Sequence, residues 1–334
     1  MKVVVIGAGR IGKLHAENLA YRIPGTSVIG IADVNQAAAQ ETATRLKIPR
    51  VATDYHDLIG LPEADAVVIC SATDTHTDII TAAAQAGKHI FCEKPIDLNL
   101  GRIDRALEAV EKAGVKLQIG FNRRFDPNFR RVRDAVIRGE VGTPQRLHII
   151  SRDPAPPPIS YVKVSGGIFV DMTIHDFDMA RYLIGSEIEE VYASAAVMVD
   201  PAIGEAGDVD TALIVLRFAN GVIGSIDNSR KAVYGYDQRV EVFGSEGSIQ
   251  TENNYPNSAI ISTAASVRRD LPLNFFLERY SESYVNEMKD FVTAVEEGGE
   301  VPVGGFDGKQ AVVVGMAARK SFDEKRPVRL SEIS

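Results

Sequence analysis

The chain begins with a short apolar run that leads directly into a glycine-rich turn. Residues 3–6 read Val-Val-Val-Ile, a β-branched run typical of a buried strand. The next six residues read Gly-Ala-Gly-Arg-Ile-Gly, and a helical pattern follows them. Gly7 permits a tight turn, Gly9 permits a ligand to approach the backbone, and Gly12 permits the helix to pack closely on the strand. A strand, turn and helix in this order predict a doubly wound parallel α/β sheet at the start of the chain.

The same segment predicts a dinucleotide site. The N-terminus of a helix presents free N–H groups and the positive end of the helix dipole, which suit a pyrophosphate. A second apolar run, residues 28–32, ends at Asp33, 21 residues after Gly12, where a carboxylate accepts hydrogen bonds from ribose hydroxyls. Val34 and Asn35 bring no cation for a 2′-phosphate, so the sequence favours NAD over NADP. The alternative is a glycine-rich turn that binds nothing.

Strand and helix patterns alternate through residue 120. Further apolar strands are expected at 66–70, 89–92 and 115–119, with helices at 14–21, 37–46, 78–86 and 103–113. This alternation is typical of a parallel sheet covered by helices on both faces, which binds ligands at the carboxyl ends of its strands. The residues expected to contact the cofactor there are Gly7, Gly9, Arg10, Ile11, Gly12, Asp33, Val34, Ser71, Ala72, Thr73, His76, Glu93 and Lys94.

The pattern changes after residue 120. A basic amphipathic helix is expected at 126–138, followed by alternating runs at 146–152, 191–199, 211–218, 222–229, 239–243 and 248–251. Glycine-containing turns at 219–221 and 245–247 predict hairpins. Two helices, near 275–297 and 306–322, close the chain. We therefore expect a Rossmann NAD-binding domain at 1–120 and, at 121–334, an α+β domain with an open, mostly antiparallel sheet for substrate binding and oligomerisation.

Bulk properties exclude several classes of protein. A length of 334 residues fits two domains, and a net charge of −8 argues against nucleic acid or an anionic membrane as a partner. No apolar run approaches the roughly 18 residues of a membrane span, and the chain starts with a strand, which leaves no room for a signal peptide. Cys70 and Cys92 each end an apolar run. They are expected to be buried free thiols of a cytoplasmic protein, and their spacing predicts no metal site.

Two groups of residues carry candidate chemistry. Lys94 follows a predicted buried strand, and its ammonium can stabilise a developing alkoxide, although pairing with Glu93 in solvent is an equal alternative. Asp171 and His175 are four residues apart, so on a helical turn they share a face. There the carboxylate can fix the imidazole tautomer and raise its basicity, which provides a base for a hydroxyl proton. The alternatives are that His175 only caps or packs or, less favoured, binds a metal.

The chain resembles the glucose–fructose oxidoreductase/inositol dehydrogenase family over nearly its whole length. The motifs that carry the resemblance occur in the order of the family: the glycine-rich turn, Glu93-Lys94-Pro95, Gly120-Phe121-x-Arg123-Arg124-Phe125 and Asp171-x-x-x-His175-Asp176. The resemblance implies that Lys94, Asp171 and His175 form the catalytic group. The residues that it implies for substrate binding are Lys94, Arg124, Asp153, Asp171, His175 and Tyr236.

The resemblance also implies a reaction. Residues 151–158 and 165–178 are similar to those of the inositol-oxidising members, which implies NAD-dependent hydride transfer from myo-inositol to give 2-keto-myo-inositol, an inosose. Other members act on scyllo-inositol, glucose or other polyols, and some bind NAD only as regulators; these readings remain alternatives, although the intact Lys94 and His175 argue against a regulator. The family resemblance further implies a homotetramer formed through the C-terminal sheet.

Overall fold

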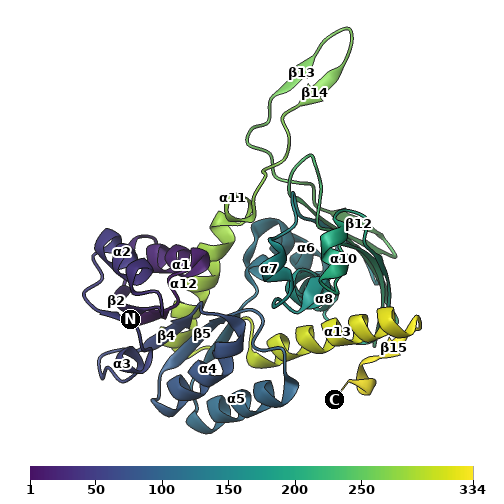
Figure 1. Cartoon of the computed structure of the whole chain (residues 1–334). Helices are drawn as coiled ribbons and strands as arrows, with labels where there is room; N and C mark the ends of the chain where they lie inside the picture. The colour runs from purple at the N-terminus through teal and green to yellow at the C-terminus, as the bar shows by residue number, and fades with distance from the viewer. Residues whose placement is uncertain (334) are drawn as a thin grey trace. The chain divides into compact units, whose positions relative to one another are not determined.

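The computed structural model describes residues 1–333, which fall into two compact units (Figure 1). Unit 1 comprises Met1–Phe125 and Glu282–Gln310, and unit 2 comprises Asp126–Ser281 and the chain from Ala311 onward. The sequence predicts that all residues after 120 belong to the second domain, whereas residues 282–310 return to unit 1. They do so because Met288, Phe291 and Val292 are buried in the core cluster of unit 1, where the hydrophobic effect favours them.

Unit 1 contains a six-stranded parallel sheet in the order β3-β2-β1-β4-β5-β6. This is the strand order of a doubly wound Rossmann sheet. Successive strands are added in one direction from β1 and in the opposite direction from β4, so the strand order reverses between these two strands. The strands are β1 (Lys2–Ile6), β2 (Ser27–Ala32), β3 (Val51–Ala52), β4 (Ala66–Ile69), β5 (His89–Glu93) and β6 (Leu117–Gly120). Its helical segments are α1 (Arg10–Tyr21), α2 (Gln36–Leu46), α3 (His56–Ile59), η1 (Thr73–Thr75), α4 (His76–Gln85), α5 (Leu100–Ala113), η2 (Asn122–Phe125) and α12 (Ser281–Glu297).

Unit 2 contains a seven-stranded sheet in the order β12-β11-β7-β10-β9-β8-β15. Only β7 and β10 pair in parallel, so the predicted mostly antiparallel sheet is confirmed. The predicted turns join β9 to β10 and β11 to β12 as hairpins. The strands are β7 (Pro144–Arg152), β8 (Ile188–Ala196), β9 (Thr211–Phe218), β10 (Ile223–Ser229), β11 (Asp237–Gly244), β12 (Gly247–Gln250) and β15 (Val328–Arg329).

The two faces of this sheet differ. Helices pack on one face, where α9 contacts β7, α6 contacts β11, and Ser321 of α13 accepts a hydrogen bond from the backbone of β8. The helices of unit 2 are α6 (Pro127–Ile137), α7 (Ile159–Val162), α8 (Gly167–Asp171), α9 (Ile174–Ile184), α10 (Pro201–Glu205), α11 (Phe276–Arg279), α13 (Gly305–Glu324, which starts in unit 1) and η3 (Leu330–Glu332). The other face presents large apolar side chains to solvent: Tyr192, Leu213, Val215, Ile223 and Phe243.

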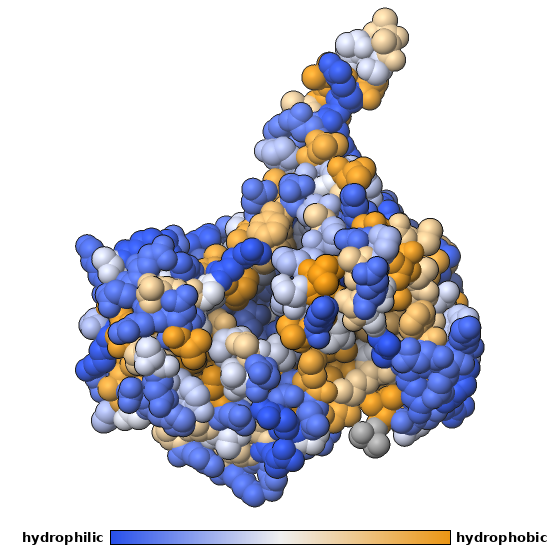
Figure 2. Space-filling model, in the orientation of Figure 1, coloured by the Kyte–Doolittle hydropathy of each residue, from blue (hydrophilic) through white to orange (hydrophobic). Residues whose placement is uncertain are grey.

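A projecting arm was not predicted from the sequence. Strands β13 (Ile260–Ser262) and β14 (Val267–Arg269) form an antiparallel hairpin that extends away from the rest of unit 2 (Figure 1). Apolar and polar residues both cover its surface (Figure 2), and Ile260 and Val267 are 60% and 73% exposed. Its two strands are only three residues long, which is too short for an alternating pattern to predict them. Among the described residues, no helix is long and apolar enough to cross a membrane.

Candidate functional site

The glycine-rich turn lies at the carboxyl end of β1 and leads into α1. Gly7 has a φ of +103°, and a Cβ there would lie 2.5 Å from the carbonyl oxygen of Cys70. A Cβ on Gly12 would lie 1.9 Å from the carbonyl oxygen of Gly7. By contrast, no atom lies within 4 Å of a Cβ built on Gly9, which is exposed. Gly7 and Gly12 are therefore needed for the turn itself, whereas Gly9 leaves its outer side open to a ligand such as a pyrophosphate.

Asp33 is anchored to this turn by backbone hydrogen bonds. Its Oδ2 accepts from the N–H of Ala8 at 2.6 Å, and its Oδ1 accepts from the N–H of Asn35 at 2.8 Å. Each carboxylate oxygen keeps a further lone pair for a hydroxyl donor. The neighbouring Val34 is 93% exposed. A fixed acid beside an open helix N-terminus fits the adenosine and pyrophosphate portions of NAD.

His76 is buried at the start of α4. Its Nδ1 lies 2.9 Å from the carbonyl oxygen of Pro95, and its Nε2 lies 3.1 Å from the carbonyl oxygen of Ser71. Burial lowers the pKa of His76, although both carbonyl contacts oppose the shift. The imidazole therefore joins the chain after β4 to the chain after β5, which is the segment that carries Lys94.

Lys94 is the first residue after β5, and its side chain is half-buried. The preceding residue, Glu93, interacts through Oε1 with Nε2 of the fully buried His15 at 2.7 Å. Oε1 of Glu287 on α12 lies 3.8 Å from the same nitrogen. No local sequence pattern connects His15 with these residues, because Glu93 and Glu287 reach it only through the fold. One ligand atom of each of these residues lies within 4.8 Å of the others.

Arg124 lies in η2, directly after β6, and is buried. Its guanidinium donates to Oδ1 of Asp307 at 3.0 Å, and Oδ2 of Asp307 accepts from the N–H of Gly304 at 3.2 Å. Asp307 belongs to the segment that returns to unit 1. Sequence reasoning named Arg124 as a substrate contact and did not find Asp307, the acid that balances its charge.

In unit 2, Asp171 is held by two side chains. It ends α8, where its Oδ1 accepts from the hydroxyl of Tyr161 at 2.9 Å. Its Oδ2 accepts from both terminal nitrogens of Arg230 at 3.2 Å. The Arg230 side chain is 1% exposed. Burial and the negative charge of Asp171 raise the pKa of Tyr161, so the tyrosine hydroxyl keeps its proton and stays a donor to Asp171.

His175 is the second residue of α9 and is half-buried. Sequence spacing placed it on one helical turn with Asp171, but the helix is interrupted at Met172 and Thr173. The Thr173 hydroxyl donates to Oδ1 of Asn228 at 2.6 Å, and Nδ2 of Asn228 donates to the buried Asp176 at 2.9 Å. Asn228, on β10, therefore fixes the turn that carries His175, because its side chain bonds to the residues on both sides of that turn.

The structure brings several further predicted residues to one edge of the unit 2 sheet. Arg152, Ser229 and Asp237 are register partners at the ends of β7, β10 and β11. Asp153 follows the first of these, Arg230 follows the second, and Tyr236 precedes the third. The backbone of Asp153 bonds to Ser229 at 2.9 Å, whereas the Tyr236 ring is buried and lies edge-on to Tyr280 with centroids 5.9 Å apart.

Three supporting residues, Tyr161, Asn228 and Arg230, were missed from the sequence. The only signal was the polar run Asp227-Asn228-Ser229-Arg230 at the end of a predicted strand. In a strand with one exposed face, every second residue is polar simply because it faces solvent. Half of such a run is therefore expected without any function. The partners of these residues lie 10 to 59 positions away in the chain, so spacing alone did not single them out.

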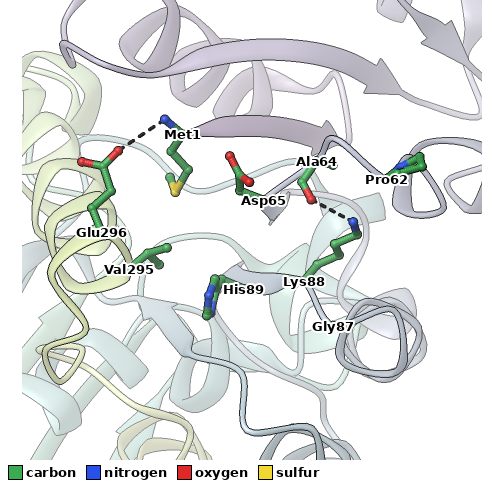
Figure 3. A pocket seen from close by; sticks show the side chains of 9 residues that line it. All are labelled: Met1, Pro62, Ala64, Asp65, Gly87, Lys88, His89, Val295 and Glu296. Atoms are coloured by element: carbon green, nitrogen blue, oxygen red, sulfur yellow. Dashed lines mark hydrogen bonds and ion pairs between the residues drawn. The ribbon is translucent and has the colours of Figure 1, made fainter.

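A surface pocket of unit 1 is lined by none of the site residues described above (Figure 3). It is lined by residues that precede β1, β4 and β5 or begin β5, among them Met1, Asp65 and His89, and by Val295 and Glu296 of α12. The amino group of Met1 pairs with Glu296 at 3.3 Å, and Lys88 donates to the carbonyl oxygen of Ala64 at 2.8 Å. Because it lies at the amino ends of parallel strands, this pocket is at the opposite edge of the sheet from the glycine-rich turn.

Known protein families match segments in both the N-terminal and the C-terminal part of the chain. Residues 1–121 match the oxidoreductase family with an NAD-binding Rossmann fold, and residues 129–250 match the GFO/IDH/MocA C-terminal domain. The chain is 52% identical to a myo-inositol 2-dehydrogenase of Thermotoga maritima, over 100% of this chain and 99% of that protein. It is 46% identical to an inositol 2-dehydrogenase of Rhizobium meliloti, over 98% of each.

A solved structure is also similar to the chain over its whole length, at a lower sequence identity. The scyllo-inositol dehydrogenase of Lactobacillus casei, with bound NAD(H) and scyllo-inositol, is 28% identical and covers 99% of each chain with a TM-score of 0.93. The similarity to these proteins therefore extends over both units and not only over the Rossmann sheet.

Proposed function

Because the chain belongs to the GFO/IDH/MocA oxidoreductase family, with its NAD-binding Rossmann domain, we propose that it oxidises myo-inositol to 2-keto-myo-inositol with NAD. The observation that carries the proposal is the full-length similarity to inositol dehydrogenases, at 52% identity for the Thermotoga protein. The anchored carboxylate of Asp171 and the fixed turn of His175 support it, since both suit removal of a hydroxyl proton.

Unit 1 is the proposed NAD-binding domain and unit 2 the proposed substrate-binding and oligomerisation domain. NAD, when bound, supplies the acceptor for the hydride. The open turn at Gly9 and the anchored Asp33 suit its pyrophosphate and adenosine ribose. The residues proposed to hold it are Gly7, Gly9, Arg10, Ile11, Gly12, Asp33, Val34, Ser71, Ala72, Thr73, His76, Glu93 and Lys94. Of these, His76 acts through the backbone of Ser71 and Pro95.

The proposed chemistry divides between three residues. His175 takes the proton of the reacting hydroxyl while the hydride leaves the same carbon atom. Asp171, which is paired with Arg230, stabilises the imidazolium that forms. Lys94 orients the substrate oxygen and stabilises the negative charge that develops on it. Arg124, Asp153 and Tyr236 are proposed to bind the remaining hydroxyl groups of the ring.

We further propose a homotetramer formed through the unit 2 sheet. Five large apolar side chains on its uncovered face are 41% to 60% exposed: Tyr192, Leu213, Val215, Ile223 and Phe243. An apolar face of this kind marks a protein interface. An isolated two-stranded hairpin is marginally stable in water, so the arm formed by β13 and β14 is also expected to contact a second copy. Sedimentation of the purified protein tests this, and a monomer at micromolar concentration would contradict it.

A cytoplasmic location is proposed from the cysteines. Cys70 and Cys92 are free, and burial raises the pKa of both thiols. Thiols in this state persist in a reducing compartment.

The test of the proposed function is turnover on a panel of inositols and aldoses, each with NAD and with NADP. We expect the highest kcat/KM with myo-inositol and NAD. A higher kcat/KM with scyllo-inositol or glucose would reassign the substrate. Equal use of NADP would contradict the role of Asp33, because a carboxylate repels a 2′-phosphate. Binding of NAD without turnover on any member of the panel would favour a regulator.

A further inference from the structure

A buried cluster of ionisable side chains lies directly behind the segment that carries Lys94. It is formed by His15 of α1, Glu93 at the end of β5 and Glu287 of α12, all within unit 1. Their side chains are 0%, 14% and 0% exposed. Of the three, only Glu93 is therefore partly exposed, and the proposed reaction leaves the other two residues without a role.

The Glu93 side chain is fixed by its neighbours. Oε1 accepts from Nε2 of His15 at 2.7 Å, and because a carboxylate only accepts, this nitrogen carries the hydrogen. On the other side, a Cβ on Gly120 would lie 3.0 Å from both Cδ and Oε2 of Glu93. The His15 ring is in turn held edge-on by Phe91 and Tyr284, with centroids 5.2 Å and 5.8 Å away.

The topology gives Glu93 the same place in its half of the sheet that Asp33 has in the other. Asp33 follows β2, which is paired with β1, and Glu93 ends β5, which is paired with β4. In a doubly wound sheet each half binds one mononucleotide, on either side of the point where the strand order reverses. If Asp33 serves the adenosine half, Glu93 serves the nicotinamide half.

We infer that His15 is a positioning residue that holds Glu93 as a fixed negative charge, which favours the cationic nicotinamide of NAD⁺ over the neutral ring of NADH. The inference rests on the proposed function, because it assumes that unit 1 binds NAD. It assigns a role to the acid of the Glu93-Lys94-Pro95 segment that is separate from the stabilisation of an alkoxide by Lys94. Such a charge selects the oxidised cofactor at the start of a cycle and promotes release of the reduced one.

The second carboxyl group is uncharged in this account. Neither oxygen of Glu287 has a hydrogen-bond partner among residues 1–333, and an ionised carboxylate in that position is strongly disfavoured. Burial, and then the charge of Glu93, raise the pKa of Glu287 well above its usual range. Burial, and then the charge of Glu93, also raise the pKa of Cys70 and of Cys92. Glu93, which bonds to His15 and is partly exposed, is thus the member of the cluster to which we assign the negative charge.

The test compares two isosteric substitutions. Dissociation constants for NAD⁺ and NADH are measured by calorimetry on the full-length protein without substrate. We expect Glu93→Gln to lower the ratio Kd(NADH)/Kd(NAD⁺) by roughly ten-fold, mainly through weaker NAD⁺ binding. Glu287→Gln is the matched control and leaves the ratio unchanged, because it replaces a carboxyl group that is already neutral. The opposite result, with Glu287→Gln lowering the ratio and Glu93→Gln not, would overturn the inference.

His15→Phe tests the positioning role separately. Phenylalanine keeps a ring against Phe91 and Tyr284 but cannot donate to Glu93. Without that donor the Glu93 carboxyl takes up a proton more readily, so the Kd ratio should fall as pH is lowered from about 9 to about 6 and recover at high pH. The wild-type ratio should stay level over this range. A purely structural role for His15 predicts no such recovery. If His15→Phe does not fold, the two glutamine variants still decide the inference.

Three further outcomes are decisive. One equivalent of a tightly bound divalent cation in the purified protein would overturn the inference, because His15, Glu93 and Glu287 are close enough to bind one and its charge would cancel that of Glu93. Wild-type protein that binds neither nucleotide would overturn the proposed function together with this inference. Wild-type protein that binds both, with a ratio unaffected by Glu93→Gln, would overturn this inference alone.

Discussion

The glycine-rich turn of unit 1 and the Asp171 site of unit 2 are built in different ways. The turn takes its shape from backbone atoms: Gly12 packs against the carbonyl of Gly7, and Asp33 accepts from the N–H of Ala8. Asp171 is instead held by the side chains of Tyr161 and Arg230, the second of which lies 59 residues away. In the turn, the backbone limits the volume of any new side chain. At Asp171, the neighbouring side chains limit which charges are tolerated. Substitutions should therefore affect the two regions through different measurable properties.

The largest expected effect concerns His175. His175→Ala should reduce the oxidation rate by roughly 10²–10⁴-fold, the usual range for one positioned proton acceptor, and should leave NAD affinity unchanged because His175 belongs to unit 2. Steady-state rates and calorimetric binding measure the two properties. His56→Ala is the control, since that side chain is 63% exposed. A His175→Ala variant with near-normal turnover would show that the residue is structural.

Removal of the buried cation at Arg230 should mainly affect stability. Arg230→Met removes the ion pair between Arg230 and Asp171, and breaking a buried pair from one side commonly costs about 3–5 kcal/mol. Urea unfolding measures the loss. Arg319→Met, which breaks the exposed pair with Asp323, should change stability by no more than about 1 kcal/mol. Equal losses in both variants would contradict the view that unit 2 depends on a buried charge network.

Two alanine substitutions distinguish shape from ligand access in the turn. A Cβ at Gly12 overlaps the Gly7 carbonyl, so Gly12→Ala should destabilise the protein without NAD, by about 1–3 kcal/mol if neighbouring groups move. A Cβ at Gly9 has open space, so Gly9→Ala should keep that stability and weaken NAD binding. Thermal melting with and without NAD separates the two effects. Tight NAD binding by Gly9→Ala would argue against this turn as the pyrophosphate site.

The smallest effect depends on pH. Because the pKa of Glu287 is raised on folding by burial and by Glu93, its stabilising contribution is full at low pH and is lost as pH rises through the folded-state value. Glu287→Gln cannot ionise, so its free energy of unfolding relative to wild type should increase with pH by at most about 1.4 kcal/mol per unit. Glu282→Gln, with a side chain 68% exposed, should show no such slope. Parallel curves for wild type and Glu287→Gln would contradict a neutral Glu287.

The contrast between the two regions also explains which features of the fold could be predicted from the sequence. The parallel sheet and the hairpins at 219–221 and 245–247 follow from patterns within a few residues, and both are confirmed. The return of residues 282–310 to unit 1 depends on which apolar face covers which sheet. No local pattern specifies such a pairing, and the expected domain division therefore lacked it.

The candidate site shows the same division. Lys94, Asp171 and His175 were named from spacing and family resemblance, but the break between α8 and α9 was not expected. It depends on Asn228, whose amide joins Thr173 to Asp176. Likewise, His15 could not be connected to Glu93 from the sequence, because the contact spans 78 residues. Buried polar contacts between distant segments leave almost no trace in a single sequence.

The most direct test of the central claim is the fate of the hydrogen on carbon 2 of the substrate. The protein is incubated with NAD and myo-inositol that carries deuterium at that carbon, and the reduced cofactor is examined by mass spectrometry and NMR. The account predicts one deuterium on the nicotinamide ring and formation of 2-keto-myo-inositol, with both lost in His175→Ala at equal times. Reduced cofactor without deuterium, or no reduced cofactor with any inositol, would contradict direct hydride transfer from this substrate.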